Sequence, residues 1–303
     1  MRTLPVILAL LTILIVNIPG RAPAATIPDE PSAPPAGAEA PAWEKSARIE
    51  EAVLRAMAGF PGEYSVALED LSTRQRWLYN ADRRYHPAST LKLAVALYAL
   101  EQYRAGKNGW QDLIEYTPRD FETPGAGAFE TAPFGEFYPI ENLVNRSLTY
   151  SNNVAVNMLG RHLGWGNIER WTASIGGQLT HEERLPRASA LDELHWWLHL
   201  HRLSQEDPSC AELILRPLRE VTYRGRISAG LPDGVPHLHK FGSYDGNYHD
   251  AGIIYADPPY ILIVMTAGAP LDEADAAIAR VSAEIYRVTT EPGETTTPPE
   301  EAW

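Results

Sequence analysis

The sequence contains very little cysteine and very little lysine. Cys210 is the one cysteine among 303 residues, which excludes an internal disulfide and a cysteine-ligated zinc cluster. The net charge of −13 excludes the basic surface that a nucleic-acid partner requires and disfavours an anionic membrane surface. The chain also lacks a phosphate-binding glycine loop and a G-x-S-x-G nucleophile elbow. Of the 26 basic residues only four are lysines, namely Lys45, Lys92, Lys107 and Lys240.

The first residues of the chain have the pattern of a secretory signal. Arg2 precedes an almost unbroken apolar run from Leu4 to Val16, and Ala22-Pro23-Ala24 then forms a small-residue cleavage pattern. Residues 1–25 are therefore predicted to be a signal peptide, either cleaved or kept as an anchor. The expected location is secreted or periplasmic, outside the cytoplasm.

Composition divides the remaining chain into three parts. Residues 26–43 are rich in proline and alanine and are predicted to be a linker, and residues 291–303 are predicted to be a disordered acidic tail. Residues 44–290 have an ordinary apolar content and are long enough to form one large globular domain.

Hydrophobic periodicity predicts an α/β (α+β) fold for this domain. One helix and two strands begin it, three strands and one helix end it, and the middle is mostly helical. The two ends are expected to join into one antiparallel sheet of about five strands, flanked by helices and interrupted by a helical insert. The expected helices span 49–57, 89–104, much of 139–222 and 272–288, and the expected strands span 64–71, 75–80, 237–243, 249–256 and 259–267.

A serine and a lysine stand three positions apart in Ser89-Thr90-Leu91-Lys92. Positions i and i+3 share a helix face, so the Ser89 hydroxyl and the Lys92 amine are expected to touch. Pro87 places Ser89 near the start of an apolar helix, where free N–H groups favour an oxyanion. A buried lysine tends to lose its proton, as a serine–lysine nucleophile requires. The alternative is a capping serine beside a lysine that reaches solvent.

The second polar segment is Tyr150-Ser151-Asn152-Asn153, between two helical stretches. Serine and asparagine favour ordinary capping turns, which is one interpretation of this segment. In the functional interpretation Ser151 relays a proton and Asn153 forms a hydrogen bond to a substrate amide.

The third segment, Lys240-Phe241-Gly242-Ser243, lies in a strand expected at a sheet edge. Lys240 either faces solvent or brings a cation to a substrate acid or to Ser151. Gly242 would let a ligand approach the strand backbone closely, and the N–H of Ser243 would complete an oxyanion hole with that of Ser89. Because the chain otherwise prefers arginine, lysine at positions 92 and 240 indicates a need for an amine at both places.

Together these segments resemble, in order and spacing, the S-x-x-K, S-x-N and K-T-G motifs of the class A β-lactamase and penicillin-binding protein superfamily. The resemblance covers nearly the whole domain and includes the segments Y-S-N-N-x-A-x-N-x-L and H-D-A-G-I. It implies that Ser89 is the nucleophile, Lys92 its base and Ser151 the proton shuttle. The substrate contacts that it implies are Asn153, Lys240 and Gly242.

The sequence departs from the family pattern in two places. Phe241 replaces the motif hydroxyl that helps to bind a substrate carboxylate, and Ser243 or Arg226 would have to substitute for it. The segment that carries the water-activating glutamate of class A enzymes is short here and offers only Glu182 and Glu183. Without a base at that place, hydrolysis of an acyl-enzyme should be slow.

The expected activity is acyl transfer from a β-lactam or a related amide to Ser89, without a metal ion or cofactor. Three possibilities remain open at this point: a β-lactamase, a peptidoglycan D-alanyl-D-alanine carboxypeptidase or other peptidase that releases β-lactams slowly, and a non-catalytic wall-binding protein. The expected partner is a small β-lactam or a peptidoglycan-type peptide. Neither a nucleic acid nor a stable protein partner is expected.

Overall fold

Both ends of the chain contribute strands to one antiparallel sheet in the computed structural model, which describes residues 45–123, 125, 127–182 and 185–291. The strand order is β2-β1-β10-β9-β8, and β1 pairs with β10. The strands are Glu63–Asp70 (β1), Arg76–Tyr79 (β2), His237–Tyr244 (β8), Asn247–Ile254 (β9) and Tyr260–Ala267 (β10). The predicted fold class and the sheet shared by both chain ends are confirmed. The predicted signal peptide and linker lie outside the described residues, as does the acidic tail after Glu291, so these remain predictions.

Strand β10 is apolar without alternation from Tyr260 to Met265. Leu262 and Val264 point into a core on one face of the sheet, and Ile261 and Ile263 point into a core on the other. Successive side chains of a strand face opposite sides, so a central strand that is covered on both faces must be apolar throughout.

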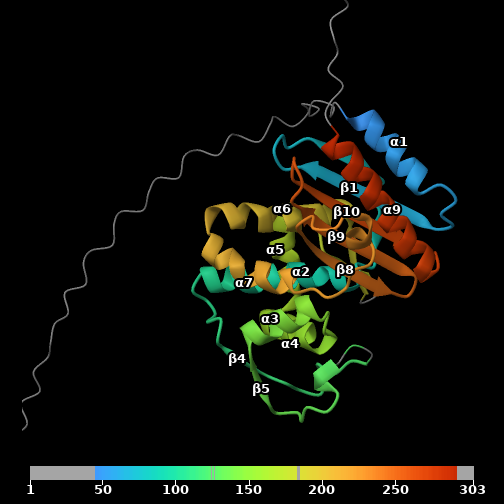
Figure 1. Cartoon of the computed structure of the whole chain (residues 1–303). Helices are drawn as coiled ribbons and strands as arrows, with labels where there is room; N and C mark the ends of the chain where they lie inside the picture. Colours follow the sequence, from blue (N-terminus) through green and yellow to red (C-terminus); the bar gives the residue numbers. More distant parts are fainter. Residues whose placement is uncertain (1–44, 124, 126, 183–184, 292–303) are drawn as a thin grey trace, which may run out of the picture. The chain divides into compact units, whose positions relative to one another are not determined.

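Two long helices cover one face of the sheet. Helix α1 (Ser46–Ala56) and helix α9 (Leu271–Thr290) lie side by side there (Figure 1). Ile49 and Val53 of α1 and Ile278 of α9 are fully buried in the core beneath them. The first and last helices of the domain therefore close the same face, as the sheet pairing of the chain ends requires.

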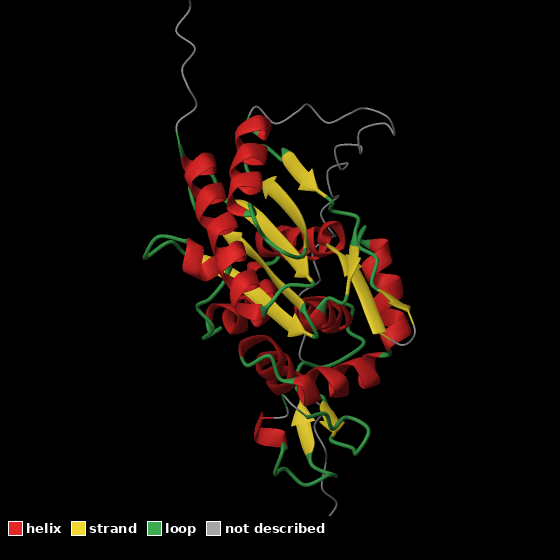
Figure 2. Ribbon diagram, turned by 90° about the vertical axis from the view of Figure 1, so that its right-hand side faces the viewer, coloured by secondary structure: helices red, strands yellow, loops and turns green. Residues whose placement is uncertain are grey.

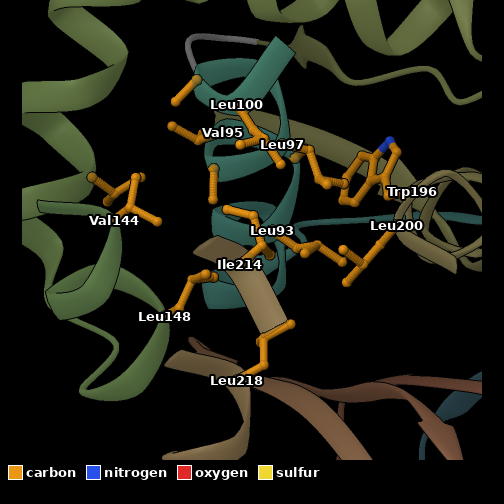
Figure 3. Close-up of a cluster of buried hydrophobic side chains, with 14 of the residues drawn as sticks. Leu93, Val95, Leu97, Leu100, Val144, Leu148, Trp196, Leu200, Ile214 and Leu218 are labelled. Atoms are coloured by element: carbon orange, nitrogen blue, oxygen red, sulfur yellow. The ribbon is translucent and has the colours of Figure 1, made fainter. Parts of the chain in front are cut away.

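The opposite face packs against helix α6 (Ala190–Glu206), and helices lie on both sides of the sheet (Figure 2). Helix α2 (Leu91–Arg104) runs through this second core, with Leu93 and Leu97 pointing toward Trp196 and Leu200 of α6 (Figure 3). Because α2 is apolar nearly all round, it is buried by neighbours on several sides. The other long helices here are α3 (Ile140–Thr149), α4 (Asn153–Leu163), α5 (Trp165–Ser174) and α7 (Pro208–Arg219).

The structure differs from the sequence expectation in its short elements. The helical insert is interrupted by two strands, and a turn of 3₁₀ helix precedes α2. Every residue of β6 is exposed, so the alternation that marks a half-buried strand is missing there. Among the described helices, none is both long and apolar enough to cross a membrane. The short elements are β3 (Arg84–Tyr85), β4 (Leu113–Glu115), β5 (Phe137–Pro139), β6 (Thr180–Glu182), β7 (Leu185–Ser189), η1 (Ala88–Thr90), η2 (Gly127–Phe129) and α8 (Ile227–Gly230).

Candidate active site

Ser89 lies in the 3₁₀ turn η1, which leads directly into α2. Ala88 before it has a φ of 51°, a left-handed backbone conformation that is rare for residues other than glycine. A Cβ atom at Gly242 of β8 would lie 2.8 Å from the Ser89 nitrogen and 3.0 Å from the Pro87 oxygen. The close approach expected at Gly242 is thus made by the turn that carries Ser89, and any side chain there would displace this turn.

The Lys92 amine lies at the centre of the predicted catalytic group. Its Nζ is 2.8 Å from Ser89 Oγ, 2.6 Å from the Ser151 carbonyl oxygen and 2.7 Å from Asn153 Oδ1. Carbonyl oxygens can only accept hydrogen bonds, so they take the two N–H groups of a neutral amine. In that neutral form the remaining lone pair of Nζ can accept the proton of the Ser89 hydroxyl.

Burial disfavours the charged form of Lys92. The side chain is 2% exposed, and its burial, together with the nearby Lys240 charge, holds its pKa well below the ordinary value. The carboxylate of Glu122 acts in the opposite direction. A lysine with a lowered pKa can accept a proton from serine near neutral pH, which an ordinary lysine cannot.

Ser151 stands between two lysines at the junction of α3 and α4. Its Oγ is 3.2 Å from Lys92 Nζ and 3.0 Å from Lys240 Nζ, and its φ of 56° is again left-handed. Lys240 is fully buried, and burial lowers its pKa to about 7. Of the two roles considered for Lys240, this geometry favours the contact with Ser151.

A cavity of about 630 Å³ opens beside Ser89, a volume that suits a small-molecule substrate. Asn153 and Ser243 line it together with the serine and Lys92, whereas Ser151, Lys240 and Gly242 are not among its described lining residues. The structure therefore places two of the four predicted substrate contacts at the cavity. Lining residues that the sequence motifs did not indicate include His86, Glu122, Glu169 and Tyr244.

Arg226 holds the edge strand in place and does not face the cavity. The side chain is 1% exposed, and its guanidinium donates to the carbonyl oxygens of Gly242 (2.6 Å) and His249 (2.7 Å) and to Asp275 Oδ1 (2.7 Å). A further N–H donates to Ser243 Oγ at 2.7 Å. The expectation that Arg226 itself replaces the motif hydroxyl is therefore not supported. Because Ser243 Oγ accepts from the arginine, its own proton is available to a ligand in the cavity.

A buried carboxyl group forms a hydrogen bond to the turn that carries the nucleophile. Thr90, next to Ser89, donates a hydrogen bond from its hydroxyl to Glu193 of α6, which is 1% exposed. Burial raises the pKa of Glu193 to about 8, so its protonated form prevails at neutral pH. The sequence around Glu193 did not predict this contact.

Residues 180–187 bring no glutamate into the cavity within the part of the chain that the structure describes. The Glu182 side chain is 60% exposed and pairs with Arg187 at 3.3 Å, and Glu183 lies outside the described residues. His181 of the same segment does line the cavity, paired with Glu169 of α5.

Comparisons with known proteins agree with this geometry. A family model described as the β-lactamase enzyme family matches residues 47–289. A β-lactamase from Sphaerobacter thermophilus has a TM-score of 0.71 at 23% identity, covering 80% of this chain and 97% of that one. PBP-A has a TM-score of 0.73 at 17% identity, covering 80% and 95%. A PBP-A mutant in acyl-enzyme complex with penicillin G has a TM-score of 0.72 at 18% identity, again covering 80% and 95%. A comparison with curated proteins found no match.

The family match spans most of the chain and includes all three polar segments. The solved structures, at these low identities, add that the fold is shared. The resemblance that the motifs indicated is confirmed, and this chain belongs to the β-lactamase enzyme family, whose members are serine hydrolases.

Proposed function

We propose that this protein is an exported hydrolase that forms an acyl-enzyme on Ser89 with a β-lactam or a related amide, using Lys92 as the base. The observation that carries the proposal is the 2.8 Å contact between Lys92 Nζ and Ser89 Oγ, in a site whose burial lowers the pKa of the amine. Export is supported by the signal pattern of residues 1–25.

The proposed reaction starts with transfer of the Ser89 proton to Lys92 while Ser89 Oγ attacks the amide carbonyl carbon. The N–H groups of Ser89 and Ser243 stabilise the oxyanion, supported by the backbone contact at Gly242 that brings β8 against the nucleophile turn. The carbon–nitrogen bond then breaks, and Ser151 Oγ passes a proton from Lys92 to the leaving nitrogen. Lys240, 3.0 Å from that oxygen, stabilises its negative charge during the transfer.

Benzylpenicillin is a suitable first probe, since a penicillin G acyl-enzyme is known for the structurally similar PBP-A mutant. We expect time-resolved intact-mass spectra of the purified protein to show an adduct on Ser89, with or without disappearance of free penicillin. Peptide mapping identifies the modified residue. If neither an adduct nor loss of penicillin occurs, the proposed function is wrong.

A peptidase that cleaves a peptidoglycan-type peptide is the second candidate. It is favoured by the position of Glu182, which faces solvent and is not among the described residues that line the cavity. An adduct that persists for hours, together with release of D-alanine from a D-alanyl-D-alanine peptide, would select this candidate. Rapid turnover of penicillin would select the β-lactamase.

Between about pH 7 and about pH 9 the rate of acylation is expected to rise less steeply than it would with an ordinary lysine as the base. Acylation needs the neutral amine of Lys92, whose fraction falls only as the pH drops through its pKa. Because burial holds this pKa well below that of a free lysine, a larger fraction of the amine is neutral over that range. Stopped-flow acylation with a chromogenic cephalosporin measures the rate. A rate that rises about tenfold per pH unit across the range would indicate an ordinary lysine pKa and contradict the mechanism.

A further inference from the structure

The cavity beside Ser89 contains acidic groups that the serine–lysine chemistry does not use. In its described part these are Glu122, on the loop before η2, and Glu169 of α5. A carboxylate in such a position can activate water, a step for which Glu182, outside the described lining of the cavity, is not placed. Which of the two carboxylates is placed for that step is decided by their contacts. The inference rests on the proposed acyl-enzyme.

The Glu169 carboxylate is engaged by a neighbouring histidine. Its carboxylate pairs with His181 Nδ1, and the imidazole packs edge-on against the Trp165 ring, 6.3 Å between centroids. Glu169 has no described hydrogen bond to the serine–lysine group.

Glu122 is instead held against the helix that carries the second motif. Asn157 Nδ2 of α4 donates to Glu122 Oε2 at 3.0 Å. Asn157 lies four positions after Asn153 and therefore on the same helix face, and Asn153 Oδ1 is 2.7 Å from Lys92 Nζ. Glu122 thus lies beside the face of α4 that binds the catalytic amine.

The loop forms polar contacts with helix α4 on both sides of Glu122. On one side, buried Asp120 pairs with Arg161 of α4 through contacts of 2.6 Å and 2.9 Å. On the other, the Gly125 carbonyl oxygen accepts a hydrogen bond of 3.0 Å from the Asn153 nitrogen. A Cβ atom at Gly125 would lie 2.6 Å from Asn153 Nδ2, so the loop packs closely on the second motif. The Glu122 side chain itself is exposed, so its position depends on this anchored loop and on the contact with Asn157.

Electrostatics agree with this placement. Glu122 is the carboxylate that raises the pKa of Lys92 against the larger effects of burial and Lys240. Its negative charge therefore acts at the amine that lies 2.8 Å from Ser89 Oγ.

We propose that Glu122 is the general base that activates the water which hydrolyses the Ser89 ester. The water oxygen attacks the ester carbonyl carbon while Glu122 takes one of its protons. The bond between that carbon and Ser89 Oγ then breaks. The proton on Glu122 returns through Lys92 to Ser89 Oγ, and the product leaves as a carboxylic acid. Carboxylate, amine and hydroxyl are all regenerated.

The test compares the wild-type protein with Glu122→Gln in the benzylpenicillin mass experiment. Glutamine keeps an oxygen that can accept from Asn157, so the loop is preserved while the base is lost. We expect acylation within about threefold of the wild-type rate and a lifetime of the adduct at least about 100-fold longer. The matched control is Glu182→Gln, the same change at an exposed side chain outside the cavity lining, which should keep the wild-type lifetime.

A second variant, Glu169→Gln, separates the two carboxylates, and we expect its adduct lifetime to stay near that of the wild type. An unchanged lifetime in Glu122→Gln overturns the inference, as does a long lifetime in Glu169→Gln alone. An adduct that already persists in the wild-type protein also overturns it, while leaving the proposed acylation of Ser89 intact. Absence of both adduct and penicillin loss in all the proteins would instead contradict the proposed function itself.

Discussion

Replacing Ser89 with alanine is expected to abolish covalent labelling by benzylpenicillin. The substitution removes the oxygen that lies 2.8 Å from Lys92 Nζ and that forms the ester. The hydroxyl of Ser151 is no substitute, because it lies between two lysines and is not among the described residues that line the cavity. Intact-mass spectra after long incubation at high penicillin concentration provide the measurement.

The matched control is Ser72→Ala, the same change in the exposed turn between β1 and β2. It should label as the wild-type protein does. Because alanine is small and η1 keeps its backbone contacts, the Ser89→Ala protein should unfold at nearly the wild-type urea concentration. A penicillin adduct on this folded variant would show that the nucleophile is a different residue.

Replacing Lys92 is expected to slow acylation by about 10²- to 10⁴-fold, the usual contribution of a general base. Arginine keeps a positive charge but stays protonated, so Lys92→Arg loses the base. Arginine is also larger, and Lys92 is 2% exposed, so this variant alone would not separate lost chemistry from a disturbed site. Methionine has a similar length and no charge, and Lys92→Met therefore removes the amine with less disturbance.

The measurement for Lys92 is the second-order rate constant of acylation by a chromogenic cephalosporin, with urea unfolding as the test of folding. Lys107→Arg, at an exposed position after α2, is the matched control and should acylate at the wild-type rate. If folded Lys92→Met acylates within about tenfold of the wild-type rate, the amine is not the base and the reaction needs another proton acceptor.

The chemistry-bearing segments were predictable because their geometry is local. An i, i+3 spacing at the start of an apolar helix predicted contact between Ser89 and Lys92, and the atoms lie 2.8 Å apart. The sheet was predictable for a similar reason, since the strand that contains Ile261 and Ile263 begins with six apolar residues directly after Pro258-Pro259. Local patterns of this kind need no knowledge of distant contacts.

The parts of the site that depend on distant contacts were not predictable. Glu122 lies in a loop with no periodic pattern, and its partner Asn157 is 35 residues away along the chain. Arg226 has a left-handed φ of 52°, a conformation that no sequence pattern predicts for an arginine. Glu193 contacts Thr90 across 103 residues, and helical spacing alone would have assigned a glutamate to a solvent-facing position.

The pairing of β1 with β10 determines when during its synthesis the protein can become active. This pairing sets Glu63 opposite Ala267. Strand β8, which carries Lys240 and Gly242 and packs against the nucleophile turn, is joined to β1 in the sheet through β9 and β10. A ribosome-bound chain that ends before residue 237 contains Ser89 and Lys92 but lacks the strand against which their turn packs. Contacts between such distant residues form late and slowly. A penicillin label on Ser89 would therefore mark only chains whose last strands have already emerged and docked.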